Sequence, residues 1–277
     1  MSTLLGSAEG AAISIIKTEQ LTRKFKEFTA VDAVSLTTEL GECFGLLGPN
    51  GAGKSTFIKM LTTLLPPTSG TAVLAGQDVV KNGPNVRRLI GYVPQMLSAD
   101  GGLTGYENLL ISAKLYDIPR AEREERIHEV LTRVGLEESA NKIVRAYSGG
   151  MIRRLEVAQA TLHKPRVLFL DEPTVGLDPQ ARRSVWEMIE QLRELESVTV
   201  FMTTHFMEEA DLLCDRVAIM NRGKIAVVGT PEELKASVDK ENATLEDAFL
   251  KHTGANLEEG GRFVDTARTR RTANRLG

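Results

Sequence analysis

A nine-residue loop constrains the fold of this chain more than any other feature. It comprises Gly48, Pro49, Asn50, Gly51, Ala52, Gly53, Lys54, Ser55 and Thr56, with the spacing G-x-x-x-x-G-K-[ST]. An apolar run of strand length precedes the loop and a helical stretch follows it, the context typical of loops that wrap nucleotide phosphates. Glycines let backbone N–H groups converge on one oxyanion, and the helix N-terminus adds partial positive charge. The pattern predicts that Lys54 reaches the β- and γ-phosphates and that Ser55 ligates Mg²⁺.

The segments around this loop predict an α/β fold whose core sheet is mostly parallel. Strands are predicted at residues 13–17, 34–40, 71–74, 90–93, 167–170, 198–203 and 217–220. The first two are expected to be joined through residues 25–29. Helices are predicted at residues 84–89, 179–195, 207–213, 231–237 and 245–251. A turn at residues 221–223 favours a hairpin with residues 224–228, which adds an antiparallel part.

Residues 106–163 interrupt this alternation, because their apolar residues recur at helical spacing. We therefore expect a helical subdomain, at about residues 96–163, inserted into a domain that spans residues 1–254. Residues 255–277 are polar and rich in arginine, and we expect a basic, poorly ordered tail. A solvated tail is favoured over one that binds anionic lipid.

Two further motifs carry chemistry. The apolar run 167–170 leads into Asp171 and Glu172, and a buried parallel strand delivers such carboxylates to the edge of the sheet where ligands bind. Asp171 is predicted to hold the Mg²⁺ shell, and Glu172 to orient or deprotonate the attacking water. Ser148, Gly149 and Gly150 can cap a helix and leave its first N–H groups uncovered, which makes a second anion site.

In this combination and order, residues 13–251 resemble the ATP-binding cassette (ABC) ATPases, the nucleotide-binding subunits of ABC transporters. The loop 48–56 matches their Walker A motif, residues 167–172 match Walker B, and Ser148-Gly149-Gly150 matches the signature loop. The resemblance implies four further roles. Gln95 is similar to the glutamine of the Q-loop, a catalytic and metal-binding residue, Asp178 to the D-loop aspartate, His205 to the switch histidine, and Phe25 to the aromatic residue that stacks on adenine.

The signature departs from the usual Leu-Ser-Gly-Gly-Gln, because Tyr147 and Met151 stand at its ends. With Gly229-Thr230-Pro231 and the segment 244–250, this form resembles the drug-resistance, ABC-2 branch of exporters. The resemblance implies two subunits facing each other, as a homodimer or paired with a second ATPase subunit. Each ATP would lie between one chain's Walker A loop and the partner's Ser148 loop. Membrane-spanning permease subunits must be supplied by other chains.

Composition indicates which partners the chain binds and where in the cell it acts. A net charge of −3 with 26% charged residues gives no global basic field, so no nucleic-acid partner is expected. The apolar runs are far below the roughly 18 residues of a membrane span, and no secretory signal opens the chain. We expect a peripheral protein on the cytoplasmic face of the membrane, with Cys43 and Cys214 as buried thiols. The alternatives are an ABC ATPase that acts on ribosomes, DNA or cofactor assembly, and a nucleotide-gated module without turnover.

Overall fold

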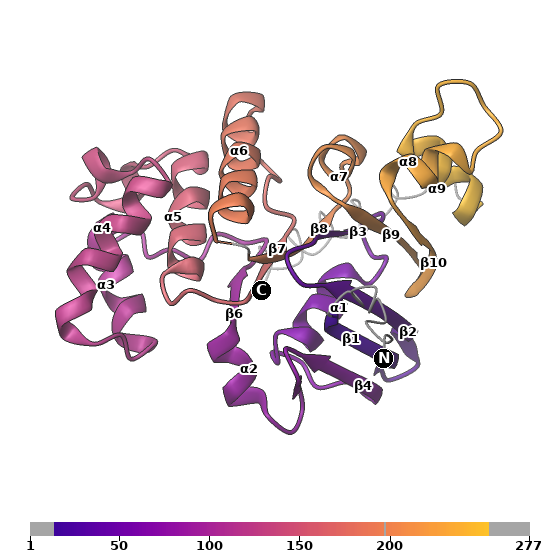
Figure 1. Cartoon of the computed structure of the whole chain (residues 1–277), viewed down its shortest axis with the longest axis horizontal. Helices are drawn as coiled ribbons and strands as arrows, with labels where there is room; N and C mark the ends of the chain where they lie inside the picture. Colours follow the sequence, from indigo (N-terminus) through magenta and orange to yellow (C-terminus); the bar gives the residue numbers. More distant parts are fainter. Residues whose placement is uncertain (1–13, 197, 255–277) are drawn as a thin grey trace, which may run out of the picture.

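The computed structural model describes residues 14–196 and 198–254, and it alternates strands with helices along the chain (Figure 1). The predicted tail lies outside these residues. The strands are β1 (Ser14–Phe25), β2 (Phe28–Glu39), β3 (Cys43–Leu47), β4 (Ser69–Leu74), β5 (Gln77–Asp78), β6 (Ile90–Val93), β7 (Val167–Asp171), β8 (Thr199–Thr204), β9 (Arg216–Asn221) and β10 (Lys224–Gly229). The helices are α1 (Lys54–Leu61), α2 (Gly83–Leu89), α3 (Gly105–Leu115), α4 (Arg123–Arg133), α5 (Gly149–Thr161), α6 (Pro179–Glu196), α7 (Met207–Leu213), α8 (Pro231–Ala236) and α9 (Leu245–Thr253).

The central sheet has six strands in the order β10-β9-β3-β8-β7-β6. Strand β3 pairs in parallel with β8 and β9, and β7 pairs in parallel with β6 and β8. Every residue of β3, β7 and β8 is buried, as expected for parallel strands that are covered on both faces. Strand β10 joins the edge as an antiparallel hairpin with β9. The predicted parallel core and the hairpin at residues 221–223 are confirmed.

Alternate residues of one strand enter separate cores on the two faces of this sheet. In β7, Leu168 and Leu170 belong to a core that includes residues of helices α3 to α7. Val167 and Phe169 belong to the other core, which includes residues of α1, β1 and β2. The Phe169 ring lies 5.6 Å from the ring of Phe201 on the neighbouring β8. Strand β7 therefore contributes side chains to both cores, and the two carboxylates stand at its end.

A second sheet, with the antiparallel order β2-β1-β4-β5, lies beside α1 (Figure 1). Here the prediction of short strands joined through residues 25–29 was wrong. Strands β1 and β2 each have 12 residues and form one hairpin that turns at residues 26–27. Polar side chains on the exposed face hid this length, and register shifts between Thr18 and Arg23 break the alternation on which a strand prediction depends.

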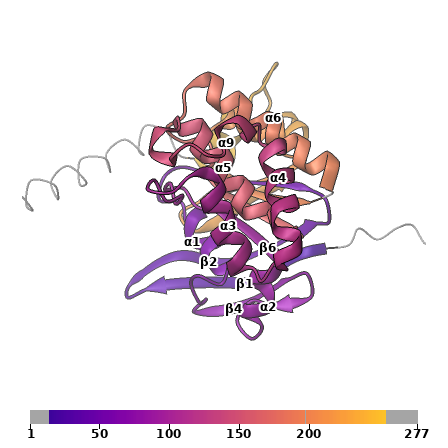
Figure 2. The same ribbon diagram turned by 90° about the vertical axis from the view of Figure 1, so that its left-hand side faces the viewer.

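Helices α3, α4 and α5 gather at one end of the molecule, opposite α8 and α9 (Figures 1 and 2). They account for most of the helical stretch predicted at residues 106–163. Helix α5 packs closely on β6, because a Cβ on Gly91 would lie 2.2 Å from the carbonyl oxygen of Ala160. Only glycine permits this approach, so α5 is fixed against the edge of the central sheet.

Both cysteines are buried free thiols, as predicted. A hydrogen bond to Cys43, together with burial, raises the pKa of the Cys214 thiol well above its usual value. This keeps the thiol protonated and unreactive. Across residues 14–196 and 198–254, no helix combines the length and the apolar character that a bilayer span requires.

Candidate functional site

The phosphate loop leaves the carboxyl end of β3 and leads directly into α1. Two of its glycines, Gly48 and Gly53, stand where a side chain would collide with neighbouring backbone. A Cβ on Gly48 would lie 2.3 Å from the carbonyl oxygen of Met220, and a Cβ on Gly53 would lie 2.3 Å from that of Ala30. Gly53 also has a φ of 108°, a left-handed conformation that favours glycine. Strands β2 and β9 therefore hold the loop in place at the start of α1, where backbone N–H groups bind anions.

Lys54 is buried in this loop, with 4% of its surface exposed. Its Nζ donates to the carbonyl oxygens of Gly48 at 2.7 Å and Pro49 at 3.1 Å, and it lies 3.0 Å from Glu172 Oε1. Burial lowers the pKa of the Lys54 ammonium, while the negative charge of Glu172 opposes the shift. Three oxygens within hydrogen-bonding distance favour the charged ammonium. A nucleotide phosphate at the loop would compete with Glu172 for it.

Glu172 is a buried carboxylate on which several loops converge. Its Oε2 accepts a hydrogen bond from Gln95 Nε2 at 3.0 Å and lies 3.2 Å from His205 Nδ1. Burial by itself raises the pKa of Glu172, but His205 and the Lys54 ammonium outweigh burial and hold the pKa below its usual value. Burial favours the neutral forms of Glu172 and Lys54, whereas their 3.0 Å separation favours the ion pair. At this separation the attraction between the two charges outweighs burial, so Glu172 is ionised as a general base must be.

Asp171 ends β7 and is buried beside Ser55. Its Oδ1 accepts hydrogen bonds from Ser55 Oγ at 3.0 Å and from Thr203 Oγ1 at 2.6 Å. The sequence did not single out Thr203, which the parallel pairing of β7 with β8 places opposite Asp171. Hydroxyl and carboxylate oxygens are the donors that Mg²⁺ prefers, and this ion commonly takes one or two protein ligands together with phosphate oxygens. Within residues 14–196 and 198–254, no cluster of three or more His, Cys, Asp or Glu residues could hold a metal.

A cavity of about 440 Å³ opens at the loop. Its wall includes residues 50–56 of the loop, together with Gln95, Glu172, Phe28 and Ala30. The sequence predicted Phe25 as the surface for adenine, but Phe28 lines this cavity and Phe25 does not. The two rings belong to paired positions at the end of the hairpin, and the Arg23 guanidinium lies 4.7 Å above the Phe25 ring. Phe28 begins β2, and the role of Phe25 as the ring that stacks on adenine stays a prediction.

The signature residues Ser148, Gly149 and Gly150 form the N-terminal end of α5. The Ser148 hydroxyl caps the helix by accepting a hydrogen bond from the Met151 N–H at 3.2 Å. Gly150 allows close contact with α6, because a Cβ there would lie 2.8 Å from the Cβ of Ala181. Asp178 caps α6 through the Ala181 N–H. A second cavity, of about 230 Å³, is lined by Ser148, Gly150, Met151, Arg154, Asp178, Gln180, Ala181 and Ser184.

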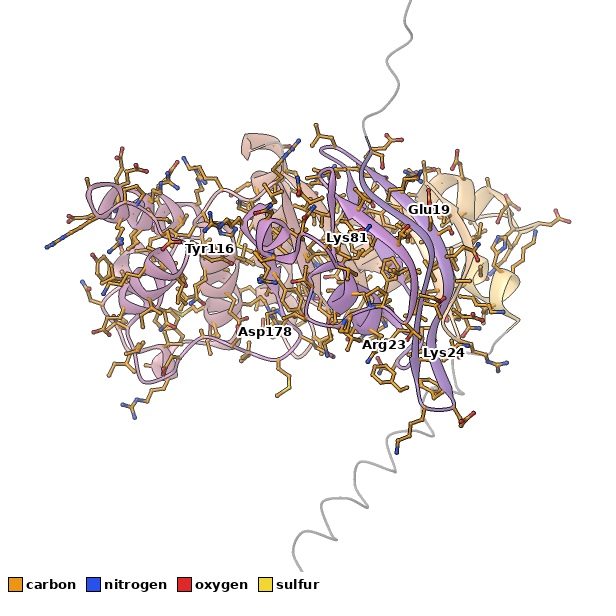
Figure 3. All side chains as sticks on the ribbon, turned by 90° about the horizontal axis from the view of Figure 1, so that it is seen from below. Glu19, Arg23, Lys24, Lys81, Tyr116 and Asp178 are labelled. Carbon is orange, nitrogen blue, oxygen red and sulfur yellow. The ribbon has the colours of Figure 1, made fainter. Side chains whose placement is uncertain are left out.

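The two cavities have no lining residue in common. In Figure 3, Asp178 lies near the middle of the molecule, on the side of Arg23 and Lys24 that faces the helical end. The first cavity brings together residues 50–56, Gln95 and Glu172, while Asp171 and His205 contact Ser55 and Glu172 of its wall. The second offers the uncovered N–H groups of a helix N-terminus to an anion. The structure thus divides the sequence-predicted site residues between two places on one chain.

A phosphate loop beside an acidic pair at the edge of a parallel sheet defines a nucleoside triphosphatase. The helical segment that presents Ser-Gly-Gly narrows this class. A family model described as "ABC transporter" matches residues 31–175. The chain belongs to the ABC transporter family, as an ATP-binding ATPase domain. The predicted fold class, the binding of ATP and its hydrolysis are thereby confirmed, and the resemblance drawn from the motifs was correct.

Named relatives are similar over most of the chain. The "Daunorubicin/doxorubicin resistance ATP-binding protein DrrA" of Streptomyces peucetius is 43% identical over 80% of this chain and 67% of its own length. The "Nod factor export ATP-binding protein I" of Ralstonia nicotianae is 42% identical over 79% of this chain and 68% of its own length. The "Probable multidrug ABC transporter ATP-binding protein YbhF" of Escherichia coli is 40% identical over 91% of this chain but only 44% of its own length. These relatives support the predicted drug-resistance branch.

Solved structures show the same fold. One described as "Structure of ATP binding subunit of ABC transporter" superimposes with a TM-score of 0.77 at 26% identity, covering 86% of this chain and 99% of that one. Another is the dimeric structure of a post-hydrolysis state of an ATP-binding cassette bound to ADP and Pi. It has a TM-score of 0.69 at 26% identity and covers 78% of this chain and 98% of the other.

Proposed function

We propose that this chain is the ATP-hydrolysing subunit of an ABC exporter and that it works by ATP-driven closure of a dimer. The observation that carries the proposal is the division of the site into two cavities without a shared residue. Lys54 and Glu172 lie at one cavity, whereas Ser148 and Asp178 line the other. A two-fold pair of chains would complete both sites at once, because each chain contributes the half that the other needs. The pair is a homodimer or includes a second ATPase subunit.

Hydrolysis is assigned to the residues around Glu172. The carboxylate takes a proton from the attacking water, and Gln95, its hydrogen-bond partner, orients that water. Lys54 and the loop N–H groups bind the phosphates, and His205 stabilises charge that develops on the γ-phosphate in the transition state. Ser55 and Asp171, with Gln95, would hold Mg²⁺, which neutralises phosphate charge during transfer.

Closure follows from binding energy. ATP favours the closed dimer because Ser148 and Gly150 of one chain would contact the phosphates at the other chain's loop, contacts that the open form lacks. Cleavage of the γ-phosphate removes those contacts, and the dimer opens again. We further propose that residues 1–254 form one ATPase domain in which residues 96–163 are the inserted helical subdomain that carries the signature residues.

Export is proposed from the relatives, whose names refer to drug resistance, Nod factor export and multidrug transport. The transported class would be a drug, a lipid or a polysaccharide. These names favour transport over a role on ribosomes, DNA or cofactor assembly. The chain would act at the cytoplasmic face of a membrane, with separate permease subunits that span it.

The docking area for a permease is proposed beside Gln95. Met96 and Leu97 follow that residue and are exposed by 82% and 52%, which is unusual for large apolar side chains. A separate groove of about 490 Å³ lies between α2, β6 and the end of α3, and its wall does not include Met96 or Leu97. The proposed docking area is therefore the exposed pair itself.

The dimer is tested with the full chain carrying Glu172→Gln, which should bind ATP without hydrolysing it. Light scattering after size exclusion should give a dimer with ATP and Mg²⁺ and a monomer without them. Adding Ser148→Arg blocks the second cavity and should abolish the dimer while ATP affinity is retained. A Glu172→Gln chain that binds ATP and remains monomeric at every concentration would refute closure.

The transport assignment has its own test. Membranes from the natural host are solubilised in mild detergent, and the tagged chain is isolated together with its partners. A polytopic membrane protein recovered with the wild type, and lost from a Met96→Asp, Leu97→Asp variant, supports the permease and its docking area. Recovery in a purely cytosolic, RNA-associated pool would instead favour the ribosome-directed alternative.

A further inference from the structure

A buried ion pair joins helix α5 to the loop that carries Gln95. Arg153 and Glu156 lie one helical turn apart on α5, and their side chains are 2% and 1% exposed, with Arg153 Nη1 2.9 Å from Glu156 Oε2. Burial of two charges is expensive unless further hydrogen bonds compensate for lost hydration. The pair finds those bonds almost entirely in the backbone of the loop that follows β6.

Arg153 binds the first half of that loop. Its Nη1 donates to the carbonyl oxygen of Pro94 at 2.7 Å, and its Nη2 donates to the carbonyl oxygen of Gln95 at 2.9 Å. The planar guanidinium therefore spans two consecutive carbonyl groups with two separate nitrogens, a geometry that an ammonium cannot reproduce. The backbone of Gln95 is held directly by α5, while its side chain binds Glu172 at 3.0 Å.

Glu156 binds the second half of the same loop. Its Oε1 accepts hydrogen bonds from the backbone N–H and the hydroxyl of Ser98, and it lies 3.4 Å from the N–H of Ala99. Arg153 and Glu156 thus hold both sides of the Gln95 loop, one by donating and the other by accepting. Because these bonds are charge-assisted and shielded from water, they are stronger than exposed loop contacts.

The other end of α5 is the signature end. Ser148 caps the helix, and the close contacts of Gly150 with Ala181 and of Gly91 with Ala160 leave little freedom between α5 and its neighbours. We propose that Arg153 and Glu156 are positioning residues that make the Gln95 loop and α5 one mechanical unit. The two residues thereby fix the position from which the Gln95 side chain reaches Glu172, with α5 as the rigid support. This inference rests on the proposed function, because Glu172 is the base in that proposal.

The test is a double-mutant cycle on ATP hydrolysis by the full chain. Arg153→Lys keeps the charge but cannot bridge both carbonyls, so kcat should fall about tenfold with KM for ATP within about twofold of the wild type. In a Gln95→Ala background the same substitution should have no further effect, because the residue through which it acts is gone. Arg126→Lys on α4, which alters an ion pair with Glu122 just before that helix, is the matched control and should hydrolyse ATP normally.

A packing role for Arg153 would give a different pattern, since its loss would multiply with that of Gln95→Ala. That result, or wild-type kcat for Arg153→Lys, overturns the proposal. If Arg153→Lys does not fold, Ser98→Ala removes only the hydroxyl contact with Glu156 and should lower kcat about threefold, again only when Gln95 is present. Wild-type kcat for Ser98→Ala would then count against it. The ATP-dependent dimer of Glu172→Gln distinguishes failure of dimer closure from failure of the positioning role. If the dimer does not form, closure is refuted. If the dimer forms but the effects of Arg153→Lys and Gln95→Ala are additive, only the positioning role is refuted.

Discussion

Glu172→Gln should make the stability of the chain depend on ATP far more than it does in the wild type. Without nucleotide, the Lys54 ammonium lies 3.0 Å from Glu172 and is 4% exposed, so its charge relies on that carboxylate and on two carbonyl oxygens. Glutamine keeps the size of the side chain and one acceptor oxygen but removes the negative charge. A buried ammonium is then left without a counter-ion until phosphate oxygens supply one.

The magnitude follows from these contacts. Removing one partner of a buried ion pair costs about 3 to 5 kcal/mol. The Gly48 and Pro49 carbonyls and the new amide oxygen still accept from Nζ, so we expect a loss of about 2 kcal/mol in the free energy of unfolding without ATP. With saturating ATP the phosphates take over the role of the carboxylate, and the difference from the wild type should shrink below about 1 kcal/mol.

The assay is urea unfolding followed by circular dichroism, with and without ATP, in a Ser148→Arg background so that dimer closure adds nothing. Glu42→Gln is the matched control, because Glu42 is a buried carboxylate paired with Arg216 at 3.2 Å and does not line the ATP cavity. Its loss should be the same in both conditions. An equal loss with and without ATP for Glu172→Gln would mean that Lys54 does not exchange Glu172 for phosphate.

Three further outcomes follow from the site and its surroundings. Lys54→Ala should weaken ATP binding about a hundredfold by calorimetry, since the charged bonds to phosphate are lost, and unchanged affinity would count against the phosphate-loop role. His205→Ala should lower kcat by about two to three powers of ten with little change in ATP affinity, and the opposite pattern would make His205 a structural residue. Burial lowers the pKa of His163 from 6.5 to about 4. As the pH falls, this imidazole is therefore protonated in the unfolded chain before it is protonated in the folded chain. The wild type should lose roughly 3 kcal/mol of stability between pH 6.5 and pH 4. His163→Phe keeps an aromatic ring against Tyr116 but lacks this titration, so its urea midpoint should exceed that of the wild type in acid. If the urea midpoints of the two proteins changed in parallel with pH, the lowered pKa of His163 would be contradicted.

Local sequence patterns were sufficient to predict the elements whose residue pattern follows directly from burial, helix capping or chemistry. The runs at residues 90–93 and 167–170 were found because parallel strands buried on both faces are continuously apolar. The N-terminal end of helix α5 was predicted from Ser148, whose hydroxyl caps the helix. The loop 48–56 and the acidic pair after β7 were found because their chemistry demands particular residue types at fixed spacing.

The missed features depend on contacts between distant segments. Thr203 looks like any strand residue until β8 pairs with β7 and brings its hydroxyl to Asp171. The full length of the hairpin of β1 and β2 became visible only in the structure, because its strands run beyond their apolar pattern. The Arg153 and Glu156 pair reads in sequence as two charges on a helix, and nothing local indicates that both are buried.

The two-sided burial of β7 has a consequence for the order in which the molecule opens. Its residues alternate between both cores, so its backbone amides can exchange with solvent only when a large part of the protein unfolds. Native-state hydrogen exchange should therefore rank β7 among the slowest segments. Asp171 ends that slow element and Glu172 follows it directly, while Gln95 and His205 come from the loops after β6 and β8. Asp171 and Glu172 therefore stay in place through each turnover, and the side chains that move are those on the loops, Gln95 and His205.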